Sequence, residues 1–243
     1  MIEINIKDGT GQYNIRGLKD CTFFEYNNSS KFLVWEMNWN TLMNFFVGRI
    51  PKGQILYLKH FELLSRKLEK GDVNESNVVE LITPILKSFS NGKYKIEFIR
   101  DYADAFIVKT GVSTYTSNGK EFIEKGTWVG GSPFIYAIQN HTDEERVAYY
   151  IDLIKKGYKP QVILIKLENS EINFILDGHH KLAACKEGYE AMHAIQITKM
   201  NNYETTEDEI YKVFKKTGEG DEYKTRLADH LNQIRKNTTT NNI

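Results

Sequence analysis

The chain of 243 residues is 41% hydrophobic and 26% charged, and its 32 Lys and Arg residues balance 32 Asp and Glu residues. This composition is typical of a globular protein that buries a sizeable core, and it excludes a disordered or fibrous chain. The net charge of zero argues against a primary role in binding nucleic acid, because proteins that neutralise phosphate backbones are usually basic.

Cysteine content and hydrophobicity indicate the compartment. Cys21 and Cys185 lie far apart in the sequence and fit a reducing environment better than a disulfide scaffold. The N-terminus lacks the apolar core of a signal peptide, and no apolar run approaches the ~20 residues needed to span a bilayer. We therefore expect a cytoplasmic protein without a membrane segment.

The first half of the chain alternates between β and α patterns. Ile2, Ile4 and Ile6 alternate with polar residues, as in a half-buried strand. Apolar residues at helical spacing predict helices, and Pro84 should kink or break the second of them. The expected strands are 2–6, 32–37, 94–99, 105–109 and 112–116, and the expected helices are 55–69 and 75–89. Residues 1–125 therefore form an N-terminal α+β region whose role the sequence does not reveal.

A glycine-rich stretch, 126–133, marks a boundary between the two halves. A strand is expected at 134–138, followed by a helix that opens near His141 and ends near Gly157. Thr142 and Glu145 have the spacing of a capping box, which gives Glu145 a structural role at the start of this helix.

The second half reads as a compact mixed sheet with flanking helices. Near-continuous apolar runs predict buried strands, and Gly188 closes a helix. The expected strands are 159–167, 172–176 and 191–198, the last at the far side of the sheet. We expect helices at 182–187, 205–214 and 222–235, and a polar tail from Asn237. The predicted class is α+β, with a domain at 126–216 and a terminal helix and tail at 217–243.

The sequence Asp177-Gly178-His179-His180-Lys181 lies between a predicted strand and a predicted helix. Gly178 can adopt backbone conformations closed to other residues and leaves room for a ligand to approach. The N–H groups and dipole of a helix N-terminus attract anions, above all phosphate, and the two histidines and the lysine add donors. Asp177 would repel phosphate unless a divalent cation or a proton lies between them. This combination predicts a site for a metal-bound nucleotide.

The segment Leu-Asp-Gly-His-His-Lys-Leu-Ala-Ala, with the preceding strand 159–167, resembles the ParB/sulfiredoxin superfamily. The resemblance covers about residues 132–214 and is greatest to the free-serine-kinase-like branch, which has an Asp-Gly-His-His-Arg signature. It implies phosphoryl transfer from ATP or ADP to a small hydroxylated molecule or a peptide side chain. Gly178, His179, His180 and Lys181 would bind the phosphates, and Asp177 would hold Mg²⁺ or help to deprotonate the acceptor.

The resemblance also implies an acidic general base between the first strand and the first helix of the domain. Glu144 and Glu145 are the candidates, and Glu144 is preferred because Glu145 has the capping role. A match by spacing alone would place the base near Asn140, which cannot accept a proton. His180 completes the set of expected catalytic residues.

Other members of the superfamily fit less well. The reactive cysteine of sulfiredoxin corresponds to His179, and the Gly-Glu-Arg-Arg run of chromosome-partitioning ParB corresponds to residues 178–181. Two alternatives stay open, a non-catalytic nucleotide-sensing or protein-interaction module and a metal-dependent nuclease. A protein partner or a second copy of the chain could bind through the N-terminal region or the last helix.

Overall fold

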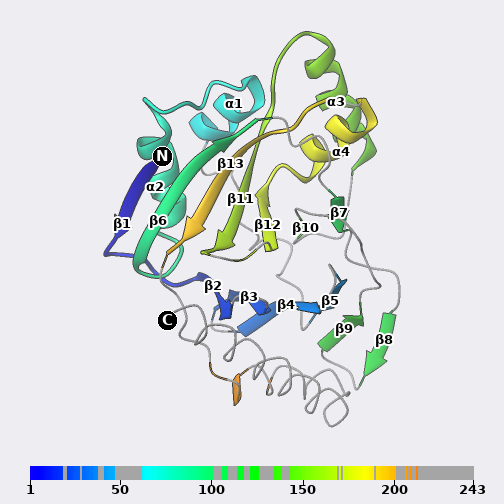
Figure 1. Cartoon of the computed structure of the whole chain (residues 1–243). Coiled ribbons are helices and arrows are strands. Elements are labelled where there is room, and N and C mark those ends of the chain that lie inside the picture. The colour runs from blue at the N-terminus through cyan, green and yellow to red at the C-terminus, as the bar shows by residue number, and fades with distance from the viewer. Residues whose placement is uncertain are drawn as a thin grey trace, which may run out of the picture.

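The structure is a computed structural model. It describes residues 1–18, 21–27, 29–37, 41–46, 62–100, 106–108, 114–117, 121–125, 134–137, 143–168, 170, 172–188, 190–200, 206, 208–209 and 212. These residues form two β-sheets and four helices, so the predicted α+β class is confirmed. Figure 1 shows the smaller sheet below the larger one, with α1, α3 and α4 at the top of the view.

The larger sheet, sheet A, is mixed and has seven strands within the described residues. The pairs β13–β11, β12–β10 and β10–β7 are parallel, and the other pairs are antiparallel. In spatial order the strands are β1 (Ile2–Ile6), β6 (Gly92–Ile99), β13 (His193–Lys199), β11 (Gln161–Leu167), β12 (Ile172–Asp177), β10 (Phe134–Ala137) and β7 (Phe106–Val108).

The placement of β13 differs from the prediction. This strand was expected at the far side of the sheet, but it lies between β6 and β11. Strand β12 runs antiparallel to β11 and returns the chain to the end of the sheet where β11 begins. Helix α4 then connects β12 to β13, which starts at that same end and runs parallel to β11. Strands β1, β6 and β7, which lie within residues 1–125, share this sheet with the strands of the second half.

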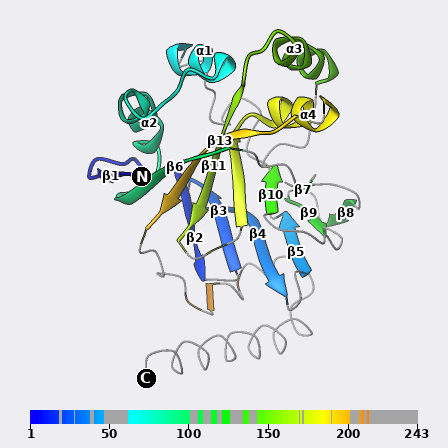
Figure 2. The same ribbon diagram turned by 45° about the horizontal axis from the view of Figure 1, so that its top comes forward.

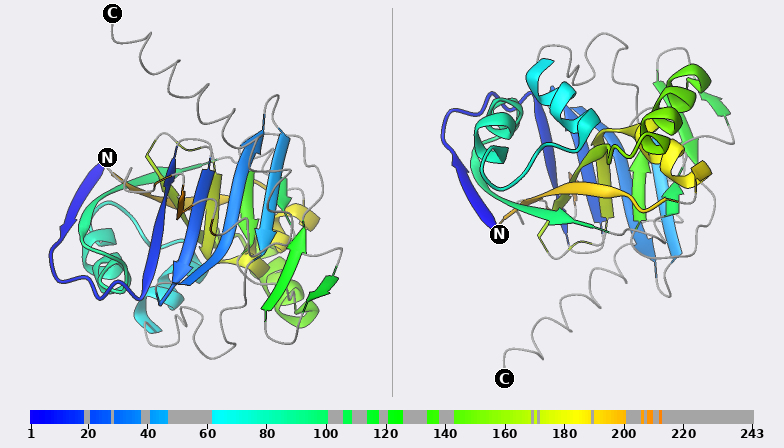
Figure 3. Two further views of the ribbon diagram at one scale, coloured as in Figure 1. Left: turned by 90° about the horizontal axis from the view of Figure 1, so that it is seen from below. Right: turned by 90° about the horizontal axis from the view of Figure 1, so that it is seen from above.

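The smaller sheet, sheet B, is antiparallel throughout. Its strands, in spatial order, are β2 (Tyr13–Leu18), β3 (Cys21–Tyr26), β4 (Ser29–Met37), β5 (Thr41–Phe46), β9 (Glu121–Lys125) and β8 (Thr114–Ser117). Figure 3 shows sheet B nearest the viewer from below, and α1, α3 and α4 nearest the viewer from above.

The helices of the described residues are α1 (Glu62–Lys70), α2 (Val78–Leu86), α3 (Glu144–Lys155) and α4 (His179–Gly188). Each overlaps a predicted helix, and α2 continues past Pro84 to Leu86. None of them is long and apolar enough to cross a bilayer. The predicted helix at 222–235, the glycine-rich stretch 126–133 and the polar tail lie outside the described residues.

The two faces of sheet A pack against different elements. Alternate residues such as Ile163, Ile165 and Phe174 face a core that includes α1, α2 and residues of β2 and β3. Val162, on the opposite face, packs in a second cluster with Leu182 of α4. Figure 2 shows the pair α3 and α4 on one side of the sheet's upper end and the pair α1 and α2 on the other. Because successive residues of β11 point to opposite faces of the sheet, Val162 packs towards α4 while Ile163 and Ile165 pack towards α1 and α2.

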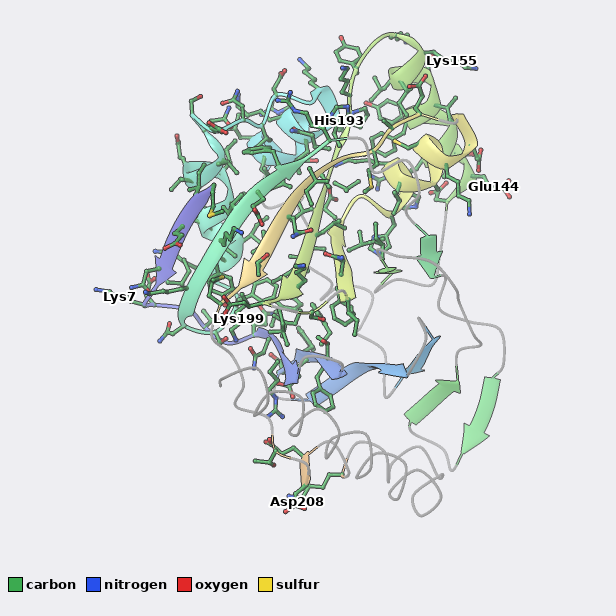
Figure 4. The ribbon with its side chains drawn as sticks, viewed as in Figure 1. Lys7, Glu144, Lys155, His193, Lys199 and Asp208 are labelled. Carbon is green, nitrogen blue, oxygen red and sulfur yellow. The ribbon has the colours of Figure 1, made fainter. Side chains whose placement is uncertain are left out.

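Lys199, at the end of β13, joins the two sheets. Its ammonium group is buried and donates to Asn14 Oδ1 at 2.7 Å and to Ser90 Oγ at 2.6 Å. Asn14 is in turn bonded to Glu25 on β3. Figure 4 shows Lys199 at the lower end of β13, next to sheet B, and His193 at the upper end. The candidate site described next lies at the upper end, away from sheet B.

Candidate functional site

The predicted corner forms where β12 leads into α4. Strand β12 ends at Asp177, and α4 begins at His179, so Gly178 alone makes the turn. Gly178 has φ of +107°, and a Cβ atom added there would lie 2.5 Å from Val162 Cγ1 and 3.1 Å from Val162 Cα. Glycine is required here because β11 fills the space beside it. The sequence predicted that a ligand would lie close to Gly178. On the side where a Cβ atom would stand, the group that lies close to Gly178 is Val162 of β11.

Asp177 and Lys181 bind each other one helical turn apart. Lys181 Nζ lies 2.5 Å from Asp177 Oδ2 and donates a second hydrogen bond, of 3.1 Å, to the carbonyl of Gln161. The Lys181 side chain is 3% exposed, whereas that of Asp177 is 24% exposed. The ammonium also lies 5.9 Å from the ring centre of Tyr150 on α3. Lys181 is therefore held inside the fold, and Asp177 is the member of the pair that reaches the surface.

The two histidines occupy the first turn of α4, and both are partly buried. Burial lowers the pKa of His179 to about 4, although the nearby Asp177 carboxylate opposes this shift. His179 is consequently neutral at pH 7. Its Nε2 atom is buried and has no hydrogen-bond partner among the described residues. A buried polar atom without a partner is unfavourable, so this nitrogen is a natural contact for a ligand.

Glu144 and Glu145, the predicted general bases, lie exposed in the first turn of α3. Helix α3 contacts the corner through Tyr150, whose ring lies beside Lys181. Glu144 is six residues before Tyr150 and thus roughly 9 Å away along the helix axis. The described structure therefore brings Asp177, His179, His180 and Lys181 together, whereas both glutamates are exposed on α3.

The N-cap of α3 differs from the predicted Thr142. Asp143 is the cap, and its Oδ1 accepts hydrogen bonds from the N–H groups of Glu145, at 3.0 Å, and Arg146, at 3.3 Å. The predicted register was wrong by one residue, because Asp and Thr are both good cap residues and stand next to each other here.

Substitution of Asp143 by alanine is expected to lower the free energy of unfolding by about 1 kcal/mol, because two helix N–H groups lose their acceptor. Chemical denaturation followed by circular dichroism measures the change. Glu144→Ala, beside the cap, should change stability by less than about 0.5 kcal/mol. Equal losses in the two variants would contradict the assignment of Asp143 as the cap.

The residues at the corner are of the types that would hold a phosphate group and one Mg²⁺ ion. Mg²⁺ usually takes one or two carboxylates and completes its shell with water and substrate phosphates, so Asp177 alone would suffice as the protein ligand. Oδ2 of Asp177 is bonded to Lys181, so a metal ion would take the carboxylate through Oδ1. Within the described part of the chain, no cluster of three or more His, Cys, Asp or Glu side chains suits a metal ion held by the protein alone.

A cavity of about 750 Å³ lies one strand away from the corner, at the same upper end of sheet A. Its lining includes Gln161, whose carbonyl is bonded to Lys181, and Cys185 on α4. Burial raises the pKa of the Cys185 thiol to about 11, with a smaller contribution from the charge of Glu190, so the thiol is protonated at pH 7.

Several basic residues of this cavity were not predicted as functional. They are Arg100, Lys159 and His193, from the ends of three strands that are distant in sequence. Arg100 follows β6, Lys159 precedes β11 and His193 begins β13, and all three strands were predicted from the sequence. What the sequence lacked was the order of the strands, which brings these three ends together.

Comparisons of the chain with protein-family models, with curated proteins and with solved structures found no match. The function of the corner and of the cavity is therefore inferred from the residues themselves and their geometry.

Proposed function

We propose that the chain binds the phosphate groups of ATP or ADP at the corner and transfers the terminal phosphoryl group to a hydroxyl group. The acceptor is a small molecule or a peptide side chain. The observation that carries the proposal is a strand that ends in a carboxylate, turns through a single glycine and opens directly into a helix with two histidines in its first turn. The N-terminal N–H groups of such a helix favour an anion.

The residues of the corner take separate roles in this proposal. His179 and His180 form hydrogen bonds to phosphate oxygens, and the buried Nε2 of His179 gains the partner that it lacks among the described residues. Asp177 faces the reacting groups and accepts the acceptor's proton or holds the metal ion. Lys181 positions the Asp177 carboxylate through the ion pair and does not itself reach the phosphate. Mg²⁺, when bound, supplies charge neutralisation of the phosphates.

The proposal agrees with the sequence resemblance, which implies that the Asp-Gly-His-His turn of a ParB/sulfiredoxin-like domain binds phosphate. The positions of Glu144 and Glu145 favour Asp177 over either glutamate as the proton acceptor, because both glutamates are exposed on another helix. Phosphoryl transfer depends mainly on positioning and charge stabilisation, so a single well-placed carboxylate is sufficient for it.

One alternative, a nucleotide-binding module without turnover, is favoured by a specific observation. Lys181, the one lysine of the signature, is already bonded to Asp177 and to a backbone carbonyl. A site that binds phosphate through helix N–H groups and a neutral His179 can sense a nucleotide without stabilising the charge of a transition state. Release of free ADP or AMP from bound nucleotide in the presence of hydroxylated acceptors distinguishes the enzyme from the module.

Replacing His179 by asparagine is expected to raise the dissociation constant for ADP roughly tenfold, because a hydrogen bond to a charged phosphate is lost. Isothermal titration calorimetry with ATP, ADP, CTP and GTP, with and without Mg²⁺, measures the affinities. His193→Asn is the matched control, since it makes the same change at the start of β13, away from the corner. Equal affinity of the parent chain and His179→Asn would contradict a phosphate contact at His179.

The pH dependence of binding gives a further check on the same residue. A bound phosphate would raise the pKa of His179 from its value of about 4, so binding takes up a proton and affinity rises as pH falls from 7 towards 5. The phosphate groups of the nucleotide also titrate, but they do so equally with the parent chain and with His179→Asn. The difference between the two plots of affinity against pH therefore measures the protonation of His179. A difference that does not change with pH would show that His179 stays neutral in the complex.

A further inference from the structure

The cavity at the upper end of sheet A has basic residues at or next to the ends of three adjacent strands. Ile99 pairs with Ala194, and His193 pairs with Gln161, so Arg100, His193 and Gln161 follow one another across β6, β13 and β11. With neighbouring strands about 4.8 Å apart, this row spans roughly 10 Å. Lys159 lines the cavity two residues before Gln161.

Two of these basic groups are available to a ligand. The side chains of Arg100 and Lys159 are exposed, and neither forms an ion pair or hydrogen bond within the described part of the chain. Two carboxylates, Glu75 and Glu190, also line the cavity, but they come from the connections before α2 and before β13 rather than from the row itself. The lining therefore carries Arg100 and Lys159 next to the ends of β6 and β11, together with these two carboxylates.

The rest of the wall suits an organic body. Phe98 and Ile99 of β6 and Ile154 of α3 contribute apolar surface. The side chain of Gln161 holds the loop before α2 by bonding to both the N–H and the carbonyl of Val73, so this side of the cavity is preformed. A volume of about 750 Å³ lies within the range of roughly 300–1,000 Å³ that is usual for small-molecule sites.

We propose that this cavity is a second binding site, separate from the corner, for a small organic anion whose apolar body packs on Phe98 and whose oxyanion group binds Arg100 and Lys159. A guanidinium group pairs with a carboxylate or a phosphate through two parallel hydrogen bonds, and an ammonium adds a point charge. The site does not depend on the nucleotide proposal, because none of the corner residues Asp177 to His180 lines the cavity.

Four probes with the same aromatic body test the charge preference, and saturation-transfer NMR measures their binding to the full chain. Benzoate and phenyl phosphate carry the anionic groups, benzyl alcohol is neutral and benzylamine is cationic. We expect saturable binding of one or both anions and at least roughly tenfold weaker binding of the other two probes. The stronger anion identifies the oxyanion as carboxylate or phosphate. Equal binding of benzyl alcohol, or no saturable binding of either anion, would overturn the proposal.

Substitutions locate the binding on the proposed residues. The double variant Arg100→Gln, Lys159→Gln should weaken binding of the preferred anion at least roughly tenfold. Arg66→Gln, on the exposed face of α1, removes the same type of charge outside the cavity and should leave binding within about twofold of the parent. Unchanged binding in the double variant would refute the assignment.

Titration with ADP separates this proposal from the nucleotide proposal. ADP should not displace the bound anion, and the double variant should bind ADP as the parent does. Displacement of benzoate by ADP would assign the cavity to the nucleotide and overturn a separate anion site. Failure of ADP to bind at all would refute the nucleotide proposal alone and leave the anion result standing.

Discussion

Replacing Gly178 by alanine is expected to lower the free energy of unfolding by about 3 kcal/mol or more, because two penalties combine at this residue. The backbone has φ of +107°, which residues with a side chain rarely adopt, and the new Cβ would lie 2.5 Å from Val162 Cγ1. Relief of this contact would require the end of β12 to move away from β11. Urea denaturation followed by circular dichroism measures the loss.

Gly157 provides a matched control for the conformational penalty. It also has a positive φ, of +88°, but no atom lies within 4 Å of a Cβ added there. Gly157→Ala should therefore cost only about 1 kcal/mol. The excess loss in Gly178→Ala measures the contact with Val162. If both variants lost the same stability, β11 would not be packed against the corner as described.

Removal of the Asp177 carboxylate is expected to be about as damaging to the fold. Asp177→Ala leaves the ammonium of Lys181 buried without its counter-ion, which usually costs about 3–5 kcal/mol. Any loss of activity measured for this variant would therefore include a loss of folded protein. Replacing both residues, as Asp177→Ala with Lys181→Met, should recover most of the stability, because the aliphatic part of the lysine is retained and no charge is buried.

Asp152 and Lys156 form a pair with the same spacing, four residues apart, on the surface of α3. Lys156 Nζ and Asp152 Oδ2 lie 2.6 Å apart, but the Asp152 side chain is 57% exposed. Asp152→Ala should change the free energy of unfolding by less than about 0.5 kcal/mol. Comparable losses for Asp177→Ala and Asp152→Ala, measured by the same denaturation experiment, would show that burial of Lys181 does not govern the stability of the corner.

The local part of the site could be predicted from the sequence. An apolar run, a glycine and a helix that ends in Gly188 are encoded by consecutive residues, so β12, the turn at Gly178 and α4 were all expected. The pairing of Asp177 with Lys181 was missed, although their spacing is that of neighbours on one face of a helix. The sequence-based prediction gave both residues a role in binding a ligand and therefore did not pair them with each other. The burial of Lys181 depends on β11 and α3, which are distant in sequence.

The non-local part could not be predicted. Nothing in residues 191–198 indicates that β13 lies between β6 and β11, because strand order depends on how α4 crosses the sheet. For the same reason Arg100, Lys159 and His193 appeared unrelated until the fold brought their strand ends together. The resemblance also implied Glu144 or Glu145 as a general base at the corner, whereas α3 contacts the corner through Tyr150.

The central claim, that α4 and Gly178 form a phosphate site, is tested most directly by NMR. Amide spectra of the chain labelled with ¹⁵N are recorded during titration with ADP and Mg²⁺. The largest saturable shifts are expected at the amides of Gly178, His179, His180 and Lys181, and His179→Asn should weaken them. Saturation without any shift of these four amides, or no shift at all at millimolar ADP, would contradict the account.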